Sequence, residues 1–129
     1  MVSKETARWI VLAASVNLAL TGLVLIVSPA VFAAFILGAE VSEVGQALGR
    51  IAGAAMLGFA LASWPRPVTA YPPISVVRAL LSFNFLATIY LAYLGATGGL
   101  VGVLLWPAVA VHGTFAILLA RRGLVGKAT

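Results

Sequence analysis

The sequence predicts an all-α protein: a four-helix transmembrane bundle with a short interfacial helix after the first span. Of the 129 residues, 63% are apolar and 9% charged, whereas soluble domains carry about 25% charged residues. No charge interrupts the 31 positions from Trp9 to Ala39 or the 42 positions from Ala79 to Ala120. Because a helix crosses hydrocarbon in about 20 residues, the chain has room for four crossings. We expect residues 1–129 to form a single integral membrane domain.

The first span is expected over residues 9–27. Ser28-Pro29 ends it, because proline lacks the backbone donor that a helix interior needs. The same pair suits the start of a second helix over residues 30–37, with serine as N-cap, proline in the first turn and Gly38 at the end. About eight residues are too few to cross, so this helix is expected at the interface.

The N-terminus has an alternative interpretation as a signal peptide. Lys4 and Arg8 precede the apolar run, and Ala33-Ala34 has the composition of a cleavage site. The apolar run from Trp9 is longer than the 7 to 15 residues typical of such peptides. We therefore favour a membrane span.

The remaining spans are expected over residues 47–64, 74–94 and 100–120. Ser42 is suited to cap the second span, with Glu43 in its first turn. Prolines between residues 65 and 73 separate the second and third spans, and the turn at residues 95–99 separates the third and fourth. Pro107, inside the expected fourth span, should kink it.

Basic residues predict the orientation. They precede span one, lie between spans two and three, and follow span four: Lys4, Arg8, Arg66, Arg121, Arg122 and Lys127. The positive-inside rule then places both termini in the cytoplasm. These residues form no basic stripe, so the net charge of +5 does not predict nucleic-acid binding. The chain has no cysteine, which excludes thiolate chemistry and disulfides.

Two arginines fall inside the expected spans. Arg78 lies near the cytoplasmic end of span three, where its side chain can reach the headgroups as a topology or phosphate anchor. Arg50 lies on the outer side of span two, seven residues after Glu43. That spacing permits an ion pair on one helix face, and an anion or lipid-headgroup contact within the bundle is the alternative.

Three long polar side chains, Asn17, Asn84 and His112, lie near the middles of spans one, three and four. Exposure to lipid is costly, so they should face the bundle interior. They either join helices by hydrogen bonds or form a midplane pocket for a small molecule. Trp106 and Tyr90 are further candidates for lining a cavity with Arg50. One histidine without intramembrane carboxylates does not predict a metal site, and no cofactor is predicted.

Glycines recur at four-residue spacing on span two. Gly45, Gly49 and Gly53 form one stripe, and Gly58 adds small surface on an adjacent face. Such stripes let helices approach closely in lipid. Packing within one chain and contact between two copies are both compatible with the pattern.

The sequence resembles the DoxX-like superfamily of small four-helix bacterial membrane proteins. The resemblance rests on Ser28-Pro29-Ala30 before a short helix ending at Gly38, and on residues 49–53 leading into Leu57-Gly58. It covers most of the chain and implies a location in the bacterial inner membrane, with Arg50 as the one family position. A few members are linked to thiosulfate oxidation or membrane redox complexes, but no catalytic residue carries over.

We expect a structural or accessory role, through helix contacts with another copy or with a larger membrane complex. The alternative is a small-molecule or lipid binder with a polar midplane pocket. Enzymatic activity is less favoured, because acid-base chemistry in the bundle would call for carboxylates there. All three glutamates lie outside the expected spans. Membrane lipids are the one partner class that the composition requires.

Overall fold

The computed structural model describes residues 3–65 and 71–125, with side chains as far as Arg121. Within these residues all regular secondary structure is helical and there is no strand, which confirms the all-α prediction. The elements are α1 (Lys4–Val27), α2 (Pro29–Phe32), the π-helical segment η1 (Ala33–Leu37), α3 (Glu43–Ser63), α4 (Ile74–Thr97) and α5 (Leu105–Val125).

Three described helices, α1, α3 and α4, are long and apolar enough to cross a membrane. The part of α5 whose side chains are described, Leu105–Arg121, is apolar but shorter. The fold is therefore that of a helical membrane protein with three candidate spans, and a fourth crossing by α5 stays a prediction.

Serine side chains begin three of the helices as N-caps. Ser3 accepts a hydrogen bond from the Thr6 amide at 3.1 Å, and Ser42 accepts one from the Gly45 amide at 3.2 Å. Ser28 accepts from the Val31 amide at 3.4 Å, with Pro29 in the first turn of α2. The predicted caps at Ser28 and Ser42 are confirmed. Because capping satisfies amides that lack a helical partner, α1 and α3 begin four to five residues before the predicted spans.

The fourth helix departs most from the prediction. Residues 99–104 are not helical, and α5 begins at Leu105 instead of Leu100. Pro107 consequently lies in the first turn, where its missing N–H costs no helical hydrogen bond. The prediction that Pro107 kinks the helix was wrong for this reason.

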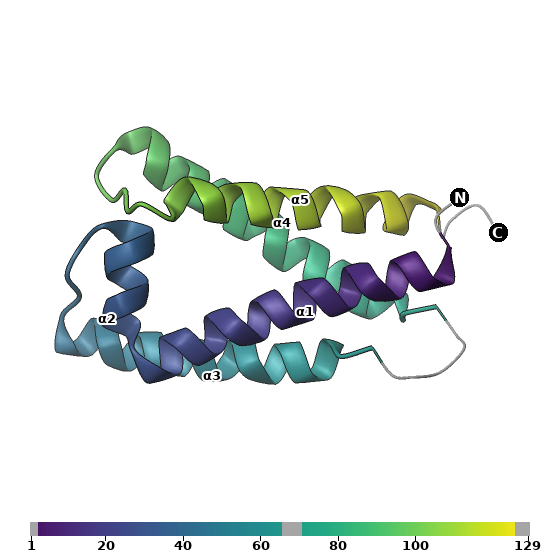
Figure 1. The fold of residues 1–129 in the computed structure, drawn as a ribbon, viewed down its shortest axis with the longest axis horizontal. Coiled ribbons are helices and arrows are strands. Elements are labelled where there is room, and N and C mark those ends of the chain that lie inside the picture. Colours follow the sequence, from purple (N-terminus) through teal and green to yellow (C-terminus); the bar gives the residue numbers. More distant parts are fainter. Residues whose placement is uncertain (1–2, 66–70, 126–129) are drawn as a thin grey trace.

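Four long helices form two pairs, α1 with α3 and α4 with α5 (Figure 1). The start of α1, the end of α3, the start of α4 and the end of α5 lie together at one end of the molecule, which we call the terminal end. Near it the two pairs share a core of Val11, Ala14, Leu18, Ala60, Val77, Leu80 and Leu119. Phe59 and Phe83 meet edge to face beside this core, with centroids 6.2 Å apart.

At the opposite end the two pairs diverge, and α2 and η1 run across the space between them (Figure 1). The α2 segment contacts α1 and α3, whereas η1 contacts α5. Two backbone hydrogen bonds join η1 to the segment before α5: the Gly102 amide donates to the Ile36 carbonyl at 3.0 Å, and the Leu104 amide to the Phe35 carbonyl at 2.9 Å. These bonds satisfy carbonyls at the end of the helix that have no helical partner.

Glycines allow the backbones of α1 and α3 to touch. A Cβ on Gly53 would lie 2.6 Å from the carbonyl oxygen of Gly22 and 2.9 Å from the Ile26 amide nitrogen. A Cβ on Gly22 would lie 2.7 Å from the Gly53 carbonyl oxygen. Both obstacles are backbone atoms, so a larger residue would have to push the helices apart.

This contact predicts opposite effects for the same substitution at two positions of α3. Gly53→Ala should lower the free energy of unfolding by about 1–3 kcal/mol, the usual cost of overpacking. Gly58→Ala is the matched control, because a Cβ there meets nothing within 4 Å. Its higher helix propensity should leave stability unchanged or raise it by up to about 1 kcal/mol. Unfolding in mild detergent, followed by circular dichroism, measures both, and equal effects would contradict the assigned contact.

Candidate functional site: an internal polar pair and a cavity at the terminal end

Asn84 and His112 form a hydrogen-bonded pair between α4 and α5. Asn84 Oδ1 and His112 Nδ1 are 2.8 Å apart, and the two residues are 2% and 9% exposed. An amide oxygen can only accept, so the imidazole Nδ1–H donates. Asn84 Nδ2 donates in turn to the carbonyl of Leu80 at 2.8 Å. The pair thus joins the two helices and is fixed to the backbone of α4.

One aromatic ring packs against this pair, and a second ring packs against the first. Phe83 meets the His112 ring edge to face with centroids 5.8 Å apart, and Phe59 of α3 meets Phe83 in the same manner. The imidazole therefore has a polar contact with Asn84 and an apolar contact with Phe83, and Phe83 in turn contacts α3. This surrounding favours a role in holding the helices together.

Asn17 does not join the pair. It is half-buried on α1, and its side chain makes no hydrogen bond with the described residues. The Asn17 carbonyl accepts from the Thr21 hydroxyl at 2.9 Å. Of the three polar residues predicted at the midplane, the structure brings two together.

The other residues proposed to line a pocket lie on the outside. Tyr90 is 62% exposed and Trp106 52% exposed, and Arg50 is also exposed. The Trp106 ring packs against Gly95, where an added Cβ would lie 2.8 Å from the Trp106 Cζ2 atom. Arg50 forms no ion pair with Glu43 or any other described residue. These three side chains do not converge with Asn84 and His112.

The glycines predicted to serve helix packing have different surroundings. Gly53 meets α1 at Gly22, and a Cβ on Gly49 would lie 2.9 Å from the Pro29 Cβ. Gly45 lies against the side chain of Val41. Gly58 is exposed with open space around it. The stripe of Gly45, Gly49 and Gly53 therefore packs within the chain, whereas Gly58 faces outward.

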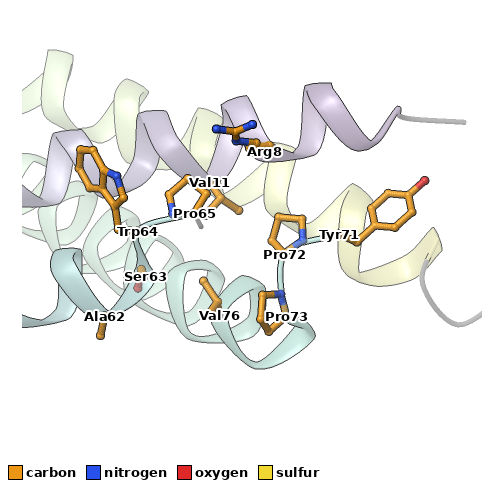
Figure 2. Close-up of a pocket in the computed structure, with 10 residues that line it drawn as sticks. All are labelled: Arg8, Val11, Ala62, Ser63, Trp64, Pro65, Tyr71, Pro72, Pro73 and Val76. Carbon is orange, nitrogen blue, oxygen red and sulfur yellow. The ribbon is translucent and has the colours of Figure 1, made fainter. Parts of the chain in front are cut away.

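A cavity of about 390 Å³ lies at the terminal end (Figure 2). Its walls are Arg8 and Val11 of α1, residues 62–65 where α3 ends, residues 71–73, and Val76 of α4. From the sequence, Arg8 was explained as a topology signal. The prolines between residues 65 and 73 predicted a loop, but they did not indicate that residues 65 and 71 would line a cavity together with α1. Near this cavity, Lys4 Nζ lies 5.4 Å from the centroid of the Tyr71 ring, a cation–π distance.

The described residues contain no group of three histidine, cysteine, aspartate or glutamate side chains able to hold a metal ion. Comparison with family models, with curated proteins and with solved structures found no match. The resemblance to the DoxX-like superfamily therefore stays a prediction.

The hydrogen bond between Asn84 and His112 predicts energetic coupling between α4 and α5. We expect Asn84→Ala and His112→Ala each to destabilise the bundle, with a coupling of about 0.5–2 kcal/mol in a double-mutant cycle. Asn17→Ala is the matched control, because its side chain has no partner among the described residues. It should show no coupling to His112→Ala. Denaturant unfolding in detergent measures these terms, and strictly additive effects of Asn84→Ala and His112→Ala would contradict the assignment.

Proposed function

We propose that the protein is a structural or accessory component of a cell membrane, acting through contacts of its helices with lipid, with a second copy or with a larger membrane complex. The observation that carries this proposal is the pairing of Asn84 with His112 inside the chain. Polar groups that would otherwise be available for chemistry are used to connect helices.

The outward face of α3 supports a contact role. Ala54, Gly58 and Ala62 follow one another at four-residue spacing, and all three are exposed. Small residues at this spacing let two helices approach closely in lipid, where dispersion contacts and not the hydrophobic effect drive association. The glycine stripe on the opposite side of α3 is already occupied by α1 and Pro29. The exposed small residues are therefore the surface that a second helix would use.

The alternative, a small-molecule or lipid binder with a polar midplane pocket, has less support. Its proposed residues Arg50, Tyr90 and Trp106 are exposed and lie apart from the internal polar pair. An enzyme is also less favoured. Glu5 and Glu43 lie in the first turns of their helices and Glu40 in the connection before α3, all exposed.

We also propose four crossings with both termini in the cytoplasm of a bacterial cell, as in the DoxX-like superfamily. The common position of the start of α1 and the end of α5 supports an even number of crossings (Figure 1). Lys4, Arg8 and Arg121 are at this end, in agreement with the positive-inside rule. Arg66, Lys127 and the side chain of Arg122 lie outside the described residues.

The topology predicts the result of reporter fusions. A fluorescent protein, which matures only in the cytoplasm, should fluoresce when attached to either end of the chain. Alkaline phosphatase, which is active only outside it, should be inactive at both ends and active when inserted at Gly98 in the turn after α4. A C-terminal phosphatase that is active would contradict the fourth crossing.

The exposed small-residue face predicts a cross-linking result. Because the chain has no cysteine, Ala54→Cys and Gly58→Cys each introduce one thiol. Oxidation in native membranes should join these thiols to a second copy or to a partner of different mass. Leu86→Cys, exposed on α4, is the matched control and should stay monomeric. Absence of any adduct at both α3 positions would contradict the proposal.

A further inference from the structure

Among the described residues that line the cavity at the terminal end, Arg8 of α1 is the one with a charged side chain. Arg8 is exposed and forms no hydrogen bond or ion pair with the described residues. A guanidinium carries five donors in a planar fork that matches phosphate oxygens. These donors are available to a ligand in the cavity.

Further positive potential comes from two neighbours of Arg8. Lys4 lies one turn earlier on α1 and its ammonium stands over Tyr71, which lines the cavity. The start of α4 also lines it, through Pro73 and Val76. Pro73 provides no side-chain cap and the first turn has no acidic residue, so the partial positive charge of this helix end is not neutralised within α4. The cavity therefore favours an anion.

The apolar walls limit the kind of anion. Val11, Val76 and the prolines at 65, 72 and 73 contribute carbon surface. Trp64 and Tyr71 also line the cavity, from opposite sides of it (Figure 2). Tryptophan and tyrosine favour the headgroup level of a membrane. A volume of about 390 Å³ is at the small end of ligand sites, which span about 300–1,000 Å³. It suits a headgroup and not a whole lipid.

We propose that this cavity binds the phosphate group of an anionic phospholipid, with the Arg8 guanidinium as the principal contact. The acyl chains remain in the bilayer beside the helices, and the headgroup enters between α1, the end of α3 and the start of α4. The proposal does not rest on the contacts proposed for the outer face of α3, although Ala62 belongs to both surfaces. Free phosphate shares the same oxyanion chemistry, and the experiment separates the two sources.

Native mass spectrometry of the full chain in mild detergent tests the proposal. Titration with phosphatidylglycerol should give one tightly retained lipid, bound at least about fivefold more tightly than zwitterionic phosphatidylcholine. Arg8→Gln should weaken phosphatidylglycerol binding about tenfold, the loss expected for one charge-assisted contact. Arg8→Lys, which keeps the charge but not the fork, should give an intermediate affinity.

Arg78→Gln is the matched control. Arg78 is exposed on α4, one turn from its start, and does not line the cavity. Its replacement removes the same charge near the same end and should change phosphatidylglycerol affinity by less than about twofold. Equal losses for Arg8→Gln and Arg78→Gln would overturn the site in favour of diffuse attraction. Circular dichroism establishes that each variant is folded, which is expected because both arginines are exposed.

A competition with inorganic phosphate identifies the source of the oxyanion. Millimolar phosphate should leave the bound phosphatidylglycerol in place, because the lipid adds apolar contacts that phosphate lacks. Displacement of the lipid by millimolar phosphate would overturn the assignment to a lipid headgroup. Failure of wild-type protein to prefer phosphatidylglycerol over phosphatidylcholine would overturn the proposal altogether.

Discussion

Hydrocarbon offers no hydrogen-bond partner, so polar groups between the ends of membrane-crossing helices are stabilised by partners within the chain. Threonine hydroxyls do this locally: Thr21 and Thr88 donate to the carbonyls of Asn17 and Asn84, four residues earlier. Asn84 and His112 do it between helices. The carbonyls at the end of η1 receive amides from residues 102 and 104. The non-helical segment before α5 is accordingly placed where it pairs with a helix end.

The same solvent explains the role of glycine. Lipid provides no hydrophobic force between helices, so association depends on how closely their surfaces approach. Gly22 and Gly53 permit direct backbone contact between α1 and α3, and Gly102 crosses the backbone of η1 at Phe35. Gly38 turns the chain out of η1 in the left-handed region, at φ 66°, which glycine adopts without strain. Close approach of backbones at these positions thus depends on the absence of a side chain.

Helix number and caps could be predicted from the sequence, whereas the packing faces could not. Ser28-Pro29 and Ser42 determine where helices begin through local hydrogen bonds, and such signals are readable one residue at a time. The buried positions of α1, which include Ala7, Ala14 and Gly22, recur every three or four residues. Its exposed face is equally apolar, because lipid replaces water, so hydrophobic periodicity does not identify the buried side. On α1, small residues indicate the buried face better than apolar residues do.

The sequence places Asn84 and His112 at similar depth on consecutive expected spans, so a hydrogen bond between them could be predicted. That Asn17 would not take part in this hydrogen bond could not be predicted. Because a short connection joins α4 to α5, the sequence determines which of their residues lie at the same depth. The position of α1 relative to α4 depends on the packing of the whole bundle and cannot be derived from the sequence in this way. The late start of α5 had a similar origin. Residues 99–104 have helix-compatible sequence in part, but they form bends and turns, and the amides of Gly102 and Leu104 bond to η1 instead of to a helix of their own.

The cavity could be predicted even less, because its walls come from segments that are far apart in the sequence. They are the N-terminal part of α1, the end of α3 and the start of α4. The proposed topology accounts for the basic residues at this end without any ligand, because insertion of membrane spans favours arginine and lysine on one side. On that topology they would face phosphate headgroups, the anions of the membrane surface. Arg8 lines the cavity, whereas Arg78 and Arg121 do not. In the proposed site, an arginine whose position suits the topology is also placed to bind a headgroup, and the restricted backbones of Pro72 and Pro73 in the cavity wall favour a specific site over general attraction.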